Sequence, residues 1–165
     1  MTELAAGLAA AIAIGAGATA LLDLSALARR ALFGVALPDY GLVGRWIAGM
    51  ARGCFRHAAI AAAPAVRGER AIGWTAHYLI GIAFASVLLA LAGMAWARHP
   101  TLLPALMVGI GSVAAPFLLM QPGMGAGFAG SRMPDPGAAR LRSVVTHAIF
   151  GVCLYVAGWA ACWLA

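Results

Sequence analysis

The segment Ile72–Ala97, IGWTAHYLIGIAFASVLLALAGMAWA, decides the fold of this protein. It contains no arginine, lysine, aspartate or glutamate. About 20 apolar helical residues are enough to cross the hydrocarbon core of a bilayer. Lipid cannot hydrogen-bond an open backbone, so such a segment must be helical. It therefore predicts a transmembrane helix that carries one ionisable side chain, His77.

Three further segments are long and apolar enough to span a membrane: Leu4–Leu24, Leu102–Gln121 and Val144–Ala165. The composition agrees, with 64% hydrophobic residues and a mean hydropathy of +0.93. We therefore expect an all-α integral membrane bundle of four transmembrane helices, forming a single transmembrane domain over residues 1–165. The first segment has no basic leader and carries Asp23 near its end, so we expect a mature span and not a cleaved signal peptide.

The distribution of arginine predicts how the spans are oriented. All 11 basic residues are arginines, and most lie in the first and third connections, residues 29–70 and 122–142. Basic residues near span ends resist translocation, so these two connections should be cytoplasmic and both termini periplasmic. The net charge of +6 then indicates topology and attraction to anionic membrane lipid. No nucleic-acid-binding motif accompanies the arginines, so we do not expect a nucleic-acid partner.

The three cysteines, Cys54, Cys153 and Cys162, form no CxxC pair. Cys54 falls in a predicted cytoplasmic connection, where thiols stay reduced. The other two lie in an apolar helix, where cysteine acts as a small hydrophobic residue. Redox chemistry is therefore not expected.

The two halves of the chain resemble each other. Aligning Arg70 with Arg140 matches His77 with His147, and it matches Gly81 with Gly151. A second alignment matches Gly15 with Gly109. We interpret the chain as two tandem hairpin repeats, and such repeats are used in some transporters. Four helices are few for a solitary transporter, so transport would favour a homodimer.

Three ionisable residues should face other helices: Asp23, His77 and His147. Small residues flank each histidine at four-residue spacing, and the stripe before Asp23 has the same character: Gly7, Ala11, Gly15 and Thr19. Counted from the nearest arginines, the three residues lie roughly 9 to 10 Å from the cytoplasmic interface. We therefore expect one polar layer, with Gln121 as a fourth candidate member.

Three interpretations of this layer remain open. It is a hydrogen-bonded cluster that fixes helix packing, a ligand-binding or proton-coupled site, or a metal or haem site. No further spacing pattern favours metal or haem, so we assign no metal ligands and leave any cofactor unknown.

The first connection contains more than a tether requires. Its segment Pro38–Arg52, PDYGLVGRWIAGMAR, begins with Asp39 as a helix cap and predicts a short interfacial helix on the inner leaflet. We expect Arg45 and Arg52 to lie at the lipid headgroups. The following run is either a lipid-facing loop or a binding surface for phosphate or carboxylate.

The connection after the third span holds Pro122, which should kink or end the helix, and the glycine-rich sequence PGMGAG. Such glycines could cradle an anion, but in a membrane protein they more often mark close helix packing.

Four segments carry a resemblance to a known family: DYGLVGRW, FRHAAIAAAPAVRGERAIGWTAHY, MQPGMGAG and ARLRSVVTH. They are similar to segments of a bacterial inner-membrane family catalogued as domain of unknown function 2938. The resemblance covers nearly the whole chain. It implies a multi-pass protein of the bacterial inner membrane and brings no activity, cofactor or catalytic residue.

From the residues, we expect a protein that binds or transports a small or lipid-like anionic ligand through a cytoplasm-facing polar layer. The candidate ligand-binding residues are Asp23, His77, His147, Arg52, His57 and Arg67. One alternative is a membrane enzyme acting on a lipid-like substrate, with His57 or His77 as acid or base and Arg52 or Arg67 holding a phosphate. The other is a non-catalytic packing or assembly protein. No nucleophile motif or HExxH supports the enzyme, which leaves enzymatic activity undecided.

Overall fold

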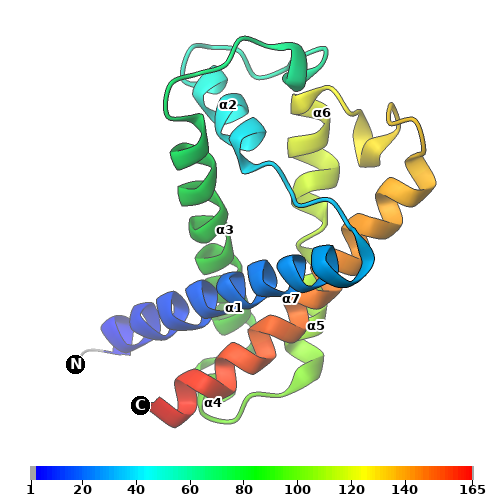
Figure 1. Ribbon diagram of the computed structural model, residues 1–165. Helices are drawn as coiled ribbons and strands as arrows, with labels where there is room; N and C mark the ends of the chain where they lie inside the picture. The colour runs from blue at the N-terminus through cyan, green and yellow to red at the C-terminus, as the bar shows by residue number, and fades with distance from the viewer. Residues whose placement is uncertain (1–2, 165) are drawn as a thin grey trace. The chain divides into compact units, whose positions relative to one another are not determined.

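The computed structural model describes residues 3–164, and within them the regular structure is helical throughout (Figure 1). Three long helices are α1 (Glu3–Phe33), α3 (Glu69–Ala92) and α7 (Pro136–Leu164). The fourth long segment, Leu102–Met124, consists of α5 (Leu102–Gly111), the π-helix η2 (Pro116–Met120) and α6 (Gln121–Met124). All four are long and apolar enough to cross a membrane, which confirms the predicted fold class.

The shorter elements lie in the connections. The short helix predicted in the first connection is present as α2 (Tyr40–Met50), and α4 (Met94–Arg98) joins the second and third spans. Two short 3₁₀ turns, η1 (Ile60–Ala62) and η3 (Phe128–Gly130), lie in the first and third connections.

Glycines with positive φ set several helix ends that differ from the expected spans. α1 continues past Leu24 to Phe33 and stops before Gly34, which has a φ of +67°. α3 stops at Ala92, because Gly93 has a φ of +78° and turns the chain into α4. Glycine adopts a positive φ at little cost because it has no Cβ atom. A residue with positive φ cannot continue a right-handed helix, so the helix ends there.

Of the two expectations for Pro122, a kink or an end of the helix, the end is not found. The helix continues to Met124 and ends at Gly125, which has a φ of +95°. The preceding turn is a π-helix, in which the Gln121 amide bonds the Pro116 carbonyl five residues back. Proline has no amide proton to donate, and a π turn shifts the bonding pattern around it.

The chain divides into two compact units. The first consists of α1 with the residues up to Leu37, Tyr78–Gly111 and the chain from Thr146 onward. The second consists of Pro38–His77 and Ser112–Val145.

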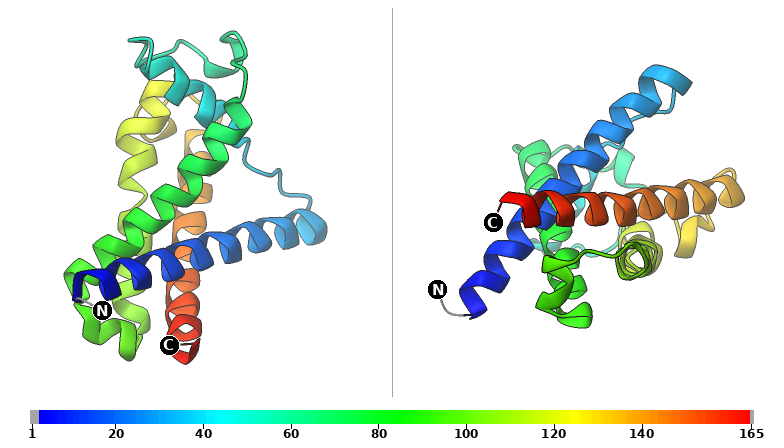
Figure 2. Two further views of the ribbon diagram at one scale, coloured as in Figure 1. Left: turned by 90° about the vertical axis from the view of Figure 1, so that its left-hand side faces the viewer. Right: turned by 90° about the horizontal axis from the view of Figure 1, so that it is seen from below.

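The first unit is held together by close contacts between small residues. α1 crosses the C-terminal half of α7, as Figure 2 shows, and a methyl group added at Gly17 would lie 3.4 Å from the Ala157 Cβ atom. The predicted stripe on α1 is confirmed, because Ala11, Gly15 and Thr19 are buried. The Thr19 hydroxyl donates to the Gly15 carbonyl at 2.8 Å, so its polar atom is satisfied within the helix.

The glycines matched by the repeat alignment contact each other in pairs. A methyl group added at Gly15 would collide with the backbone of Gly81 and Ile82. In the second half, one added at Gly109 would collide with the backbone of Gly151. Each predicted hairpin therefore brings its two spans together at equivalent glycines, which supports the repeat.

In the second unit, α2 packs through its glycines. A methyl group at Gly44 would collide with the Glu69 carbonyl and approach the Gly73 amide, and one at Gly73 would collide with the Tyr40 carbonyl. The Trp46 indole occupies the space over Gly123 of α6 in the same way. These contacts place α2 beside the start of α3 and the end of the third span.

Candidate functional site

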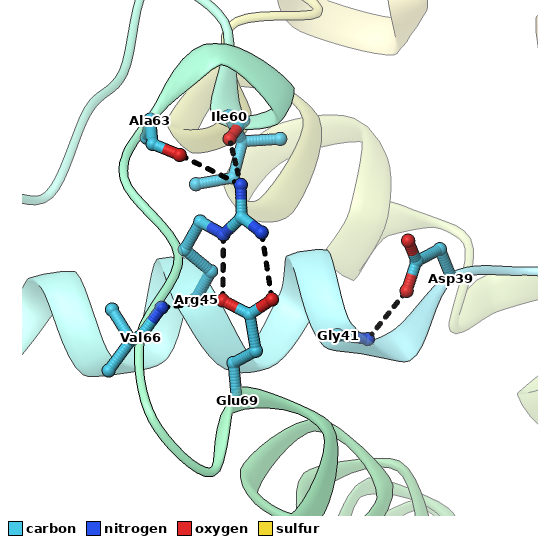
Figure 3. Close-up of polar contacts among 7 residues, drawn as sticks. All are labelled: Asp39, Gly41, Arg45, Ile60, Ala63, Val66 and Glu69. Carbon is cyan, nitrogen blue, oxygen red and sulfur yellow. Dashed lines mark hydrogen bonds and ion pairs between the residues drawn. The ribbon is translucent and has the colours of Figure 1, made fainter.

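Arg45 organises the first connection (Figure 3). Its guanidinium pairs with Glu69 through Nε to Oε2 at 2.8 Å and Nη2 to Oε1 at 2.7 Å. The remaining Nη1 group donates to the Ala63 carbonyl at 2.8 Å and the Ile60 carbonyl at 3.3 Å. The Glu69 carboxylate also accepts the Val66 amide at 2.8 Å. One ion pair thus ties α2, η1 and the start of α3 together.

The expected position of Arg45 at the lipid headgroups stays a prediction, but protein groups occupy its guanidinium. Only 13% of its side chain is exposed, and its guanidinium bonds the Glu69 carboxylate and the carbonyls of Ile60 and Ala63. Its hydrogen bonds to Glu69 raise the pKa of Arg45 above its ordinary value, so the guanidinium stays charged. A bidentate arginine–carboxylate pair also fixes geometry, because the planar guanidinium fork matches two oxygens at once.

The predicted cap of α2 is confirmed. The Asp39 side chain accepts the Gly41 amide at 2.9 Å, which satisfies one amide that the first helical turn leaves open.

A largely apolar cavity lies between α2, the following loop and the end of the third span. Its volume is about 320 Å³, at the small end of the range for ligand sites. The lining residues come entirely from the second unit: Trp46, Met50, Phe55, Arg56, Leu118, Leu119, Pro122, Gly123 and Phe128. Arg56 is the one formally charged side chain in this lining.

Hydrogen bonds hold the loop that forms one wall of this cavity. The Trp46 indole donates to the Phe55 carbonyl at 3.0 Å, and the His57 amide donates to the Gly123 carbonyl at 2.8 Å. The Cys54 amide donates to the Gly49 carbonyl at 2.9 Å. These bonds fix the loop to α2 and α6, so this wall of the cavity has a defined structure.

The candidate residues of the first connection lie differently with respect to the cavity. His57 is half-buried, and its ring packs against α2 at Gly49. Arg52 and Arg67 are exposed and do not line the cavity. Their neighbour Arg56 does line it.

The three residues of the predicted polar layer each have an identified protein partner. The Tyr78 hydroxyl donates to Asp23 at 3.3 Å. The His77 ring stacks on Tyr40, with ring centroids 4.1 Å apart. The His147 side chain hydrogen-bonds the backbone of Gly109. These partners come from neighbouring helices, as expected for inward-facing side chains. That the three residues form one layer stays a prediction.

Gln121, the fourth candidate, donates to the Ser143 hydroxyl at 3.4 Å, while its own Oε1 atom is buried without a hydrogen-bond partner. Ser143 lies one turn before His147 in the predicted small-residue stripe. Among residues 3–164, no three histidine, cysteine, aspartate or glutamate side chains lie close enough to hold a metal ion.

Four apolar helices, glycine-mediated helix contacts and arginine-rich connections define a multi-pass helical membrane protein. The chain belongs to the family described as protein of unknown function DUF2938, whose model matches residues 12–161. The resemblance seen in the sequence is thus confirmed. No curated protein and no solved structure gives a significant match.

Proposed function

We propose that this protein binds an anionic, lipid-like ligand in the cavity between α2 and the end of the third span. The observation that carries the proposal is the composition of the cavity wall. Eight of its nine lining residues are apolar or aromatic residues or glycine, and the ninth is Arg56. An acyl chain suits the apolar wall, and a phosphate or carboxylate suits the guanidinium.

The position of the cavity favours a ligand from the membrane. Leu118 and Leu119, on the last part of the third span, are 59% and 67% exposed. Exposed leucines on a spanning helix face lipid, so the cavity would open sideways into the bilayer. Arg56 would then lie at headgroup level, where a nearby cation attracts anionic lipid by about 1 kcal/mol.

The wider setting of the proposal is the bacterial inner membrane, with both termini periplasmic and the arginine-rich connections cytoplasmic. The arginine distribution supports this orientation. Arg52 and Arg67 would then add general attraction for anionic lipid from exposed positions beside the cavity. We include transport only for a homodimer, since four spans provide few helices for a pathway.

The polar layer favours a second function, the packing of the helices. Asp23 and His147 form interhelical hydrogen bonds, which contribute about 0.6 kcal/mol each, and His77 stacks on Tyr40. A role in packing is compatible with ligand binding in the separate cavity lined by Arg56.

The test of the proposed function is to fill the cavity. Leu119→Trp places a large side chain in its wall, and the exposure of Leu119 means that the fold should tolerate the change. Leu103→Trp is a matched control, because Leu103 is 69% exposed on α5 and does not line the cavity. Native mass spectrometry in mild detergent should show less bound anionic lipid for Leu119→Trp alone. Equal retention of anionic lipid by both variants would contradict lipid binding in the cavity.

A further inference from the structure

Cys54 and His57 form a thiol–imidazole pair beside the cavity. The Cys54 thiol donates to the Arg56 carbonyl at 3.5 Å, and its Sγ atom also lies 3.7 Å from Nε2 and 4.0 Å from Nδ1 of His57, within reach of a sulfur hydrogen bond. The thiol is exposed, whereas the imidazole is half-buried. A nucleophile next to a base that is itself held in place is the usual arrangement for activating a thiol.

The surroundings hold the imidazole in place. The His57 backbone amide bonds the Gly123 carbonyl at 2.8 Å. The ring packs so closely on α2 that a methyl group added at Gly49 would lie 3.0 Å from Nε2. Gly49 thus leaves the space that the ring occupies.

The cavity gives this pair a specific acyl donor. Phe55 and Arg56, the two residues between Cys54 and His57, both line the cavity. Cys54 itself does not line the cavity, but it directly precedes these two lining residues. With a long acyl chain in the cavity, the acyl carbonyl of the donor would lie at the rim next to the thiol, and the negative carrier would lie beside Arg56. The apolar wall favours a long chain over a short one, because each buried methylene contributes about 0.8 kcal/mol.

We propose that Cys54 is an S-acylation site that accepts the acyl group of a long-chain acyl thioester, with His57 as the base. This inference rests on the proposed lipid-like ligand of the cavity. The sulfur of Cys54 attacks the thioester carbonyl while His57 takes the thiol proton. A new carbon–sulfur bond to Cys54 forms and the bond to the donor sulfur breaks. The departing thiolate receives the proton from His57, so the exchange needs no oxidant or other co-reactant.

The experiment incubates the purified full-length protein in mild detergent with palmitoyl-coenzyme A and follows its intact mass. We expect one added palmitoyl group, its removal by neutral hydroxylamine, and its location on Cys54 by peptide mapping. Cys54→Ser should abolish the addition, and the matched control Cys162→Ser should not. Cys162 is a suitable control because its thiol bonds the Arg98 carbonyl at 3.1 Å, away from any histidine contact that the structure records.

Two further measurements test the mechanism. His57→Gln should slow acylation about 100-fold, the lower range for loss of a general base, while Cys54 remains accessible to a maleimide. Acetyl-coenzyme A should react much more slowly than the palmitoyl donor. Equal labelling of Cys162, equal rates with both donors, or an unchanged rate in His57→Gln would overturn the proposal. The proposed function is judged separately, by the noncovalent anionic lipid that Cys54→Ser retains. If that lipid is retained while acylation fails, only the acylation proposal is overturned.

Discussion

Arg45 and Glu69 lie 24 residues apart in the chain and form a bidentate ion pair, with nitrogen–oxygen distances of 2.7 and 2.8 Å. The same guanidinium bonds the carbonyls of Ile60 and Ala63, so one side chain ties the middle of the loop that follows α2, and the start of α3, to α2. That loop carries Cys54 and also forms one wall of the cavity. The ion pair therefore supports the proposed site from a distance.

Breaking this pair should loosen the loop before it unfolds the helices. Arg45→Gln removes the charge and the bonds to the Ile60 and Ala63 carbonyls. We expect faster trypsin cleavage after Arg56 and Arg67 and a lower Tm. Arg98→Gln, an exposed change outside this network, serves as the control. In a double-mutant cycle, Arg45→Gln and Glu69→Gln together should cost less than the sum of the single changes, because each removes the same interaction. Additive effects would mean that the pair is not coupled in solution.

The glycine contacts should be intolerant of even one methyl group. Gly15→Ala and Gly109→Ala each force a methyl group against the backbone of a neighbouring helix, so each should destabilise by about 1–3 kcal/mol. Gly111→Ala is the matched control, since a methyl group there meets no described atom within 4 Å. Thermal unfolding in detergent is the measurement. A cost for Gly111→Ala equal to that for Gly109→Ala would contradict the close packing.

The polar layer can be tested by coupling. The Tyr78 hydroxyl bonds Asp23, so Tyr78→Phe and Asp23→Asn should be non-additive in thermal stability, by about 0.6 kcal/mol. The sequence-based hypothesis of one shared layer further predicts coupling between His77→Gln and His147→Gln. If the two histidine changes add within error, each histidine serves only its local contact, with Tyr40 and with the Gly109 backbone respectively.

The orientation is tested by reporter fusions. Reporters placed after Ala165 or within residues 98–101 should be periplasmic, and those near Ala62 or Pro136 cytoplasmic, because the arginines are concentrated in the first and third connections. Alkaline phosphatase and a fluorescent protein give opposite signals at each site. A cytoplasmic signal from the C-terminal fusion would reverse the orientation and place the cavity at the outer face.

Composition and periodicity predicted the helices, because a membrane span is a local property of the chain. The small-residue stripe ending at Asp23 and the Asp39 cap were predictable for the same reason. For Pro122, the sequence left a kink and a helix end open, and the π-helix that precedes it could not be predicted because it depends on the packing of the whole helix. The sequence could have indicated that Glu69 pairs with an arginine, because Glu69 is the one acidic residue between Tyr40 and Pro134 and the cations around it are arginines. It could not have indicated which arginine.

The cavity could not have been predicted in this way. Its walls come from α2, the following loop, the end of the third span and η3, and their approach depends on tertiary packing. One partial signal was present, because Gly123 of the PGMGAG sequence provides the space that the Trp46 indole fills. The sequence indicated close packing there without naming the partner. The sequence likewise offered no reason to separate Arg56 from the neighbouring Arg52 and Arg67. Only the structure shows that Arg56 alone of the three lines the cavity.

The most direct test of the central claim measures headgroup preference at the cavity. Native mass spectrometry would compare the protein with equal amounts of phosphatidylglycerol and phosphatidylcholine carrying the same chains. The wild type should retain mainly the anionic lipid, and Arg56→Gln should lower that preference about fivefold, the equivalent of about 1 kcal/mol. Arg98→Gln should leave it unchanged. A wild type without headgroup preference, or an equal loss in Arg98→Gln, would contradict an anionic ligand held by Arg56.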